Sequence, residues 1–169
     1  MNPNRWQQIA SGAGTEEPLL ESPLIKTPED CSPDGRFLLF RRIDPKTGRD
    51  LWALPLQGER QPFPVLKTEF EERDSQFAPD GRWIAYASNA SGRFEVYVQP
   101  FPGPGGTWQV STAGGGQPRW RHDGRELFYL GPDGALMAAP IALALDGQSV
   151  ELGKPVALFV PKIVGGGAT

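Results

Sequence analysis

The chain has 169 residues and a formal net charge of −3 at pH 7. It therefore lacks the excess of Lys and Arg that neutralises a phosphate backbone, and we expect no nucleic-acid partner. One Cys and one His exclude an internal disulfide and a zinc cluster, so we also expect no cofactor. The 21 Gly and 18 Pro beside five Trp, nine Phe and three Tyr predict many tight turns between short strands that surround a packed interior.

Membrane insertion by this chain is not expected. No apolar stretch approaches the roughly 18 residues that a membrane span requires. The opening Met1–Arg5 lacks the apolar core of a signal peptide. If the natural protein is exported, we expect the signal to lie outside this chain.

One nine-residue segment occurs three times. Its copies are Ser32–Phe40, Ala78–Tyr86 and Arg121–Tyr129. Their aspartates lie 46 and 43 residues apart, and an aromatic residue follows each aspartate six positions later. Repetition at such a period indicates a repeat architecture.

A second series of apolar residues repeats in parallel with the first. Trp6, Trp52, Tyr97 and Met137 are spaced 46, 45 and 40 residues apart, and Leu20, Leu66 and Val110 follow the first three at 14, 14 and 13 residues. Each unit then holds four short strands. This pattern predicts an all-β fold, a partial β-propeller of about 3.5 four-stranded antiparallel blades.

In chain order, we expect a single domain that spans residues 1–169. It begins with an outer half-blade over 1–24, whose two strands lie near Arg5–Ile9 and Glu17–Leu20. Blades follow over 25–68, 69–112 and 113–162, and 163–169 form a frayed tail. The last hairpin of the third blade is expected to be lengthened by Ala144–Pro155.

The repeated motif is interpreted as a hairpin turn between the first and second strands of each blade. Pro presets φ, Asp caps its own backbone, and Gly accepts the left-handed conformation. The structural turn residues are Pro33, Asp34, Gly35, Pro79, Asp80, Gly81, His122, Asp123 and Gly124. Calcium ligation by the aspartates is the weaker alternative, and His122 takes the position of a turn proline rather than that of a catalytic base.

Cys31 occupies the position of Phe77 and Trp120 at the end of the first strand. The repeat therefore predicts a buried, unreactive packing residue, and a Trp at this position is expected to raise the thermal midpoint. The glycine runs Gly103–Gly106 and Gly114–Gly116 lack the Lys-Ser/Thr ending of a phosphate-binding loop and are expected to be connections.

The Pro-Asp-Gly-Arg turns, each followed by a strand that ends in an aromatic residue, resemble the WD-like repeats of TolB-type propellers over nearly the whole chain. Asp34–Leu56 and Phe101–Leu130, which includes Gln117–Trp120, resemble the six-bladed type of propeller at the C-terminal side of bacterial transmembrane serine/threonine protein kinases. This resemblance implies a sensing or protein-interaction module outside the cytoplasm, with no catalytic residue in this segment.

Two functions follow as hypotheses. The favoured one is a non-catalytic scaffold that binds a protein or peptide as part of a larger protein such as a serine/threonine kinase. The alternative is an accessory propeller of a prolyl-oligopeptidase-type hydrolase. The chain carries neither kinase signatures nor a Gly-X-Ser-X-Gly elbow, so we expect no enzyme here. Fewer than four blades predict part of a larger propeller whose open edges self-associate.

Charged residues near the links between blades form a candidate partner-binding face. The cluster Glu69, Glu71, Glu72 and Asp74 lies in one link, where a solvated loop is the plainer interpretation. The complete candidate face comprises Glu29, Asp30, Glu71, Glu72, Arg73, Asp74, Arg119 and Arg121.

Overall fold

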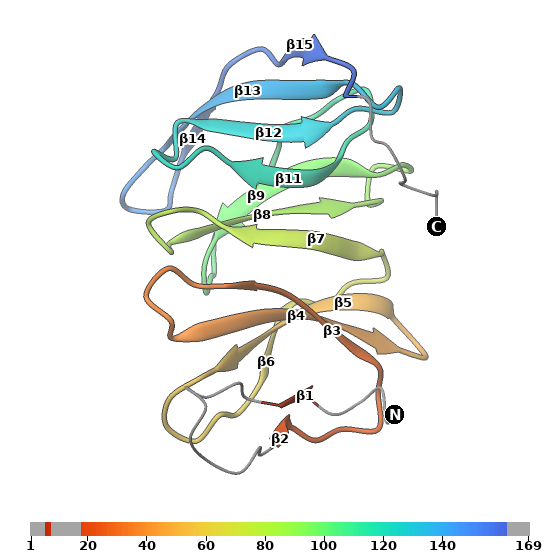
Figure 1. Cartoon of the computed structure of the whole chain (residues 1–169), viewed down its shortest axis with the longest axis vertical. Helices are drawn as coiled ribbons and strands as arrows, with labels where there is room; N and C mark the ends of the chain where they lie inside the picture. Colours follow the sequence, from red (N-terminus) through yellow and green to blue (C-terminus); the bar gives the residue numbers. More distant parts are fainter. Residues whose placement is uncertain (1–5, 8–17, 162–169) are drawn as a thin grey trace.

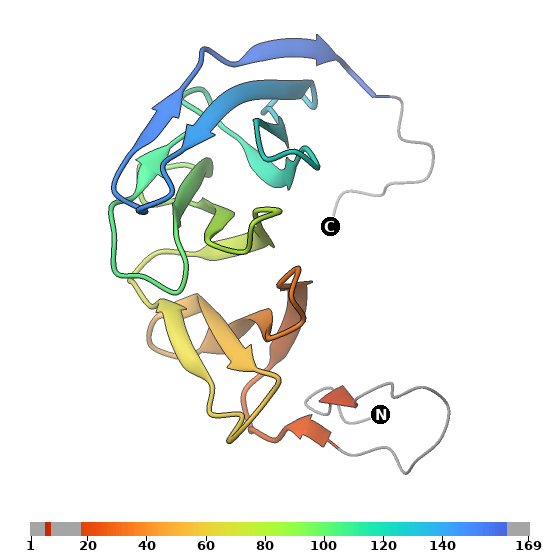
Figure 2. The ribbon, with the colours of Figure 1, turned by 90° about the vertical axis from the view of Figure 1, so that its left-hand side faces the viewer.

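The chain folds into three antiparallel sheets of four or five strands that follow one another along an arc, and a two-stranded sheet precedes them (Figures 1 and 2). The computed structural model describes residues 6–7 and 18–161. Every regular element in this described part is a β-strand. The predicted all-β partial propeller is therefore confirmed.

The first two sheets are simple four-stranded meanders. Blade one contains β3 (Lys26–Cys31), β4 (Phe37–Asp44), β5 (Gly48–Pro55) and β6 (Phe63–Leu66). Blade two contains β7 (Glu72–Phe77), β8 (Trp83–Ser88), β9 (Glu95–Pro100) and β10 (Trp108–Gln109). In each blade the strands pair in chain order, and β3 and β7 lie on the concave side of the arc (Figure 2).

Blade three has a fifth strand. It contains β11 (Gly116–Trp120), β12 (Glu126–Leu130), β13 (Leu136–Leu143), β14 (Val150–Leu152) and β15 (Val156–Phe159). β14 pairs with the last residues of β13, whereas β15 pairs with its first residues. The long β13 therefore pairs with two short outer strands in place of one. The segment predicted to lengthen the last hairpin, Ala144–Pro155, contains β14 and ends just before β15.

Two short strands precede blade one. β1 (Trp6–Gln7) and β2 (Pro18–Leu20) pair with each other as a two-stranded antiparallel sheet. The remainder of the predicted leading half-blade, and the predicted frayed tail over 163–169, lie outside the described residues.

The three Pro/His-Asp-Gly turns share one geometry. Gly35, Gly81 and Gly124 have φ values of 69°, 70° and 70°, in the left-handed region that favours glycine. In each turn an aspartate Oδ1 accepts the backbone N–H of the Arg two residues later, at 3.0 Å for Asp34, 2.9 Å for Asp80 and 3.1 Å for Asp123. These bonds fix the hairpin that joins the first two strands of each blade.

The core lies between neighbouring blades. At the junction of blades one and two, the Phe101 ring packs edge-on against Phe37 and Phe77, with ring centroids 5.2 and 4.8 Å apart. A second core cluster joins blade two to blade three, with Val96 and Val98 on one side and Leu127 on the other. Each sheet thus buries its apolar faces against adjacent blades, as the repeat predicts.

The predicted burial of Cys31 is wrong, because this residue is exposed. Its repeat equivalents contact the preceding blade. Phe77 belongs to the core cluster that joins blades one and two, and the Trp120 ring N–H donates to the Gln76 carbonyl at 3.3 Å. Within residues 6–7 and 18–161, β3 has no such inner strand before it, so the same sequence position has nothing to pack against.

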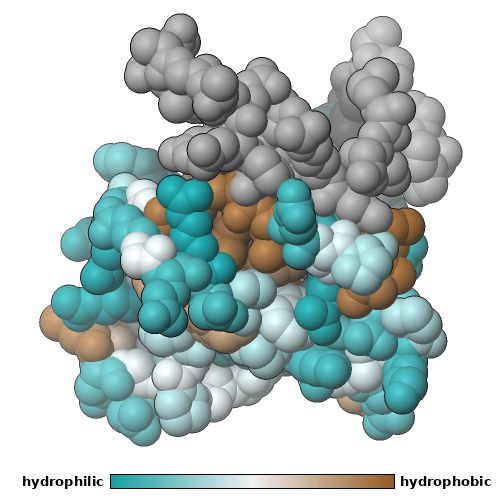
Figure 3. Space-filling model, turned by 90° about the horizontal axis from the view of Figure 1, so that it is seen from below, coloured by the Kyte–Doolittle hydropathy of each residue, from teal (hydrophilic) through white to brown (hydrophobic). Residues whose placement is uncertain are grey.

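Apolar side chains are exposed on the last strand of blade three. Val156, Leu158 and Phe159 of β15 are 53%, 48% and 58% exposed. At the other end of the arc, Leu38, Phe40 and Leu54 of blade one form a small core cluster with Leu19 and Leu20 partly packed against it. Figure 3, which views this end from below, shows hydrophobic residues at the surface beside the part drawn in grey.

Candidate binding face at the link end of the blades

Each blade has two ends of different construction. The turn end carries the Asp-Gly turns over 32–36, 78–82 and 121–125. The link end carries the connections 67–71 and 110–115, which pass from one blade to the next, and the hairpins 45–47, 89–94 and 131–135. The charged residues singled out from the sequence can be located relative to these two ends.

The inner strands are joined by hydrogen bonds from side chain to backbone. Asp30 Oδ2 accepts the Phe77 N–H at 2.8 Å, and one blade further along Gln76 Oε1 accepts the Trp120 N–H at the same distance. Because Asp30 and Gln76 occupy equivalent repeat positions, the contact repeats at each junction. Both side chains are used to join blades.

Glu29 is also engaged at the first junction. Its carboxylate accepts the Ser75 N–H at 2.6 Å, the Ser75 hydroxyl at 2.5 Å and the Asp74 N–H at 3.2 Å. Burial raises the pKa of Glu29. The hydrogen bonds from Ser75 act in the opposite direction, but the effect of burial is larger. This carboxylate therefore serves mainly to anchor β7 on blade one.

Two further carboxyl groups are buried near the same junction. Glu72 is 2% exposed and Asp50 is fully buried. Thr68 donates to Glu72 at 2.6 Å and Thr47 donates to Asp50 at 2.8 Å, while Glu72 Oε2 and Asp50 Oδ1 have no partner among the described residues. Burial, reinforced by the Asp50 charge, raises the pKa of Glu72 to about 7.

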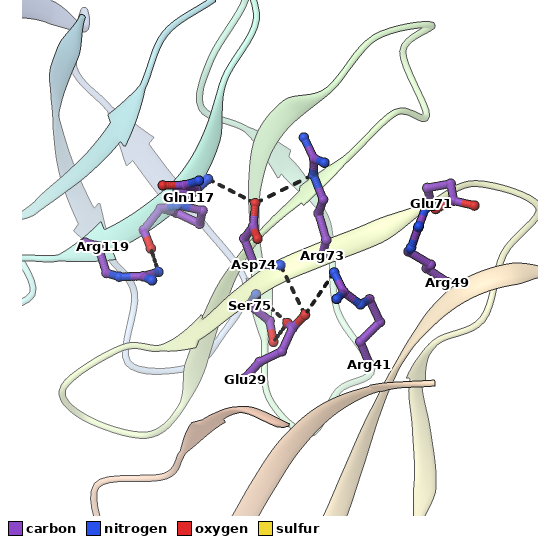
Figure 4. Close-up of polar contacts among 10 residues, drawn as sticks. Glu29, Arg41, Arg49, Glu71, Arg73, Asp74, Ser75, Gln117 and Arg119 are labelled. Atoms are coloured by element: carbon purple, nitrogen blue, oxygen red, sulfur yellow. Dashed lines mark hydrogen bonds and ion pairs between the residues drawn. The ribbon is translucent and has the colours of Figure 1, made fainter. Parts of the chain in front are cut away.

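A groove of about 780 Å³ opens at the link end, and we call it the link groove. It draws residues from all three blades: Arg41 from blade one, Arg73 and Phe94 from blade two, and Leu130 from blade three. One wall is formed by residues 113–117, which comprise the end of a connection and the start of β11 and contain Gly114, Gly115 and Gly116. Figure 4 shows Arg41, Arg73 and Asp74 beside Gln117 of blade three.

Two arginines of the link groove have weakly engaged guanidinium groups. Arg41 Nη1 lies 3.9 Å from Glu29 Oε1, and Arg73 Nε lies 3.6 Å from Asp74 Oδ2. Both distances exceed that of a hydrogen bond. The Nε atoms of Arg41 and Arg73 are buried, and neither has a hydrogen-bond partner in the described part of the chain.

A third arginine of the link groove is firmly held. Arg93 donates to Glu95 at 2.7 Å and also to the Thr112 carbonyl. Glu95 in turn is buried and accepts the Gly114 N–H at 2.8 Å. Arg93 therefore contributes positive charge and helps to fix the wall of the groove.

The structure distributes the residues of the candidate face over several places. Arg73 and Asp74 line the link groove, Glu29 is in ion-pair contact with Arg41, and Glu71 pairs with Arg49 elsewhere at this end (Figure 4). Glu72 is buried, and Asp30 bonds to Phe77. Arg119 donates to the Pro118 carbonyl, and Arg121 lies at the turn end with Asp123 and Glu126. Their assignment to partner binding stays a prediction.

Sequence reasoning missed Arg41, Arg93 and Phe94. Arg41 takes the repeat position of the uncharged Ala87 and Leu130, so a charge at this position within the second strand was the available signal. Arg93 and Phe94 follow an Asn-Ala-Ser-Gly hairpin, which places them at the link end. Their proximity to Arg73 depends on how the blades pack.

A second groove, of about 870 Å³, lies at the turn end between blades two and three. It is lined by the turns at Asp80 and Asp123, by β13 and by the neighbourhood of Leu152. Asp80 Oδ1 and Asp123 Oδ1 are already engaged by backbone N–H groups of their own turns. The charged residues Arg125 and Glu151 also line this groove.

Neither a metal centre nor a membrane span is evident in the described residues. Residues 6–7 and 18–161 contain no group of three or more His, Cys, Asp or Glu side chains arranged to hold a metal ion. The same residues form no helix long and apolar enough to cross a bilayer.

Comparison with known proteins identifies similar folds. The chain matches no protein-family model and no curated protein. Among solved structures, it is similar to a protein described as TolB from Agrobacterium tumefaciens, with a TM-score of 0.66, 19% identity, and coverage of 89% of this chain and 56% of that one. TolB from Acinetobacter baumannii gives a TM-score of 0.59 and 19% identity over 90% of this chain and 38% of that one.

A protein described as a 6-phosphogluconolactonase from Bacteroides uniformis is also similar, with a TM-score of 0.55 and 14% identity over 94% of this chain and 50% of that one. The chain thus spans about half the length of the solved structures that it matches. At these identities the likeness concerns the fold alone. The chain accordingly has the fold of a TolB-type β-propeller.

Proposed function

We propose that this chain is a non-catalytic propeller scaffold that binds a protein or peptide at its link end. The link groove carries the proposal, because it combines residues of three blades with the guanidinium groups of Arg41 and Arg73, which donate no hydrogen bond to another described residue. The terminal N–H groups of these arginines favour a ligand that supplies acceptors. The TolB-type fold supports the same assignment, since propellers commonly present binding residues on one end.

We further propose that the scaffold is the sensor or interaction part of a larger protein located outside the cytoplasm. The resemblance of Asp34–Leu56 and Phe101–Leu130 to kinase-associated propellers favours a serine/threonine kinase. The sequence of the parent gene tests this context. A kinase domain and a membrane span upstream would support it, whereas a nucleophile elbow downstream would favour the accessory domain of a hydrolase.

Selection of a phage-displayed random peptide library on the purified chain tests the binding function. We expect enriched peptides that protect the backbone amides of 113–117 from hydrogen exchange. Amides of the turn-end segment 80–82 serve as the control, and their exchange should not change. Failure to enrich any peptide, or protection confined to the turn end, would contradict the proposed function.

A further inference from the structure

We propose that the link groove recognises an acidic, extended segment of a partner protein, whose side-chain carboxylates are held by Arg41 and Arg73. This inference rests on the proposed function and specifies the ligand chemistry. It concerns a groove of about 780 Å³, which is much larger than a single small anion requires. The size therefore favours a peptide that brings several groups at once.

The first argument is the supply of unsatisfied donors. Arg41 and Arg73 approach Glu29 and Asp74 at only 3.9 and 3.6 Å, and their buried Nε atoms lack hydrogen-bond partners among the described residues. A ligand in the groove cannot reach these buried Nε atoms, so it would bind the terminal Nη groups, which donate no hydrogen bond to another described residue. A carboxylate would accept charge-assisted hydrogen bonds from these terminal groups.

The second argument is the orientation of Arg73. Its guanidinium carbon lies 3.7 Å from the centroid of the Phe94 ring. Stacking on an aromatic face holds the plane of the guanidinium and leaves the in-plane N–H groups of its terminal Nη atoms free of the ring. A planar, pre-oriented fork matches the two oxygens of a carboxylate better than it matches an uncharged amide.

The third argument is charge and access. The chain is acidic overall, with a net charge of −3, yet three arginines line the link groove beside a single lining carboxylate, Asp74. Outside the lining, Glu95 holds Arg93 at 2.7 Å and Glu29 lies 3.9 Å from Arg41, so Arg41 and Arg73 are the weakly paired charges. Gly114 and Gly115 belong to the wall, where a Cβ on Gly115 would lie 2.8 Å from Ser111 Oγ and one on Gly114 would lie 3.3 Å from Pro132. The packing of the chain itself requires these glycines, and the acidic side chains of a bound segment would reach the arginines from the open groove.

Fluorescence anisotropy with a labelled eight-residue peptide of alternating Asp and Gly, acetylated and amidated at its ends, tests the proposal. The wild-type chain should bind this peptide and not the matched Asn-Gly peptide, and added salt should weaken the binding. Arg41→Gln and Arg73→Gln should each weaken the affinity about tenfold, because a charge-assisted hydrogen bond is lost.

Arg49→Gln is the matched control. Arg49 lies at the same end of blade one but pairs with Glu71 outside the link groove, and its substitution changes the net charge by the same amount. It should leave the affinity unchanged. Thermal melts of all three variants distinguish lost binding from lost folding, and protection of the 113–117 amides by the Asp-Gly peptide gives a second, variant-independent measurement.

Four outcomes would overturn the inference. Equal binding of the Asn-Gly peptide would show that carboxylates are not recognised. Preference for an Asn-Gly peptide with a free C-terminus would show that the groove binds the terminal carboxylate of a peptide. Full competition by millimolar inorganic phosphate would show that the groove binds small anions in general. Neutral peptides that emerge from the library and protect 113–117 would sustain the proposed function while refuting its acidic ligand.

Discussion

Single residues at the first blade junction determine how the stability of the protein responds to pH. Burial raises the pKa values of Glu29, Asp30, Asp50 and Glu72. All four lie on β3, β5 and β7, so they concentrate at the contact between blades one and two. At the next junction the position of Asp30 is taken by the uncharged Gln76.

Glu72→Gln is expected to stabilise the protein above neutral pH. The folded state keeps the Glu72 proton up to about pH 7, whereas the unfolded chain releases it near the ordinary value of 4.5. The free energy of unfolding should therefore fall as pH rises from 4.5 to about 7. The total decrease is about 3 kcal/mol if the whole change in the pKa of Glu72 contributes. Denaturant melts of the wild type and of Glu72→Gln between pH 4 and 8 measure the difference.

The exposed Glu69 in the same link provides the control for that series. Glu69→Gln should follow the pH profile of the wild type, whereas Glu72→Gln should show a flatter one. An unchanged profile for Glu72→Gln, or lower stability than the wild type at pH 8, would mean that folding does not raise the pKa of the Glu72 carboxyl.

Cys31 is expected to be accessible but sluggish as a nucleophile. Partial burial, with the negative Asp30 beside it, raises the pKa of the thiol above its usual value of 9.0. The native protein should react completely with a thiol reagent, more slowly than a free cysteine peptide at pH 8 and faster as pH rises. Spectrophotometric titration of the thiol follows this rate, and no reaction without denaturant would restore the buried interpretation.

At the scale of elements, the blades are joined by a repeated contact between inner strands. Asp30 and Gln76 each accept a backbone N–H from the next blade, from Phe77 and Trp120 respectively. One acceptor side chain per blade thus satisfies a donor of the following inner strand. The contact also fixes the offset between consecutive sheets.

Asp30→Ala should destabilise the protein by about 1–3 kcal/mol, because the N–H of the buried Phe77 would lose its acceptor. Asp30→Asn keeps a side-chain oxygen at the same place and should retain most of the stability. Urea denaturation at pH 7 provides the comparison. Equal destabilisation by Asn and Ala would show that the charge, rather than the acceptor, holds the blades together.

At the scale of the whole molecule, the arc exposes apolar side chains on the last strand of blade three. Val156, Leu158 and Phe159 of β15 are exposed there, whereas the small cluster around Leu38 and Phe40 at the other end is buried. In a propeller each blade is stabilised by two neighbours. Blade two has both neighbours within the described residues, and its strand β8 is buried throughout.

The chain is expected to self-associate through the apolar surface of β15. Light scattering over a wide concentration range should show an apparent mass that rises with concentration, and Leu158→Ser with Phe159→Ser should reduce the rise. Leu145→Ser, which removes an exposed leucine from the β13–β14 hairpin, should have little effect. A monodisperse monomer, equally stable when the chain is extended by flanking blades, would contradict the expectation.

The sequence by itself determined the architecture, because the turn chemistry is local. Asp34, Asp80 and Asp123 cap their own backbones, and the glycines that follow them adopt left-handed conformations. A hairpin formed by residues this close in sequence needs no knowledge of the remainder of the chain. The period of these hairpins and the apolar strands between them were then enough to predict stacked four-stranded blades.

Only the tertiary structure decided which equivalent positions are buried and which charged groups meet. Cys31 and Phe77 hold the same place in the repeat, yet only Phe77 has a preceding inner strand in the described chain to pack against. Arg41 and Arg73 are separated by 31 other residues and come together because two sheets pack side by side. Burial and electrostatic contact depend on neighbours in space, which a repeat period does not specify.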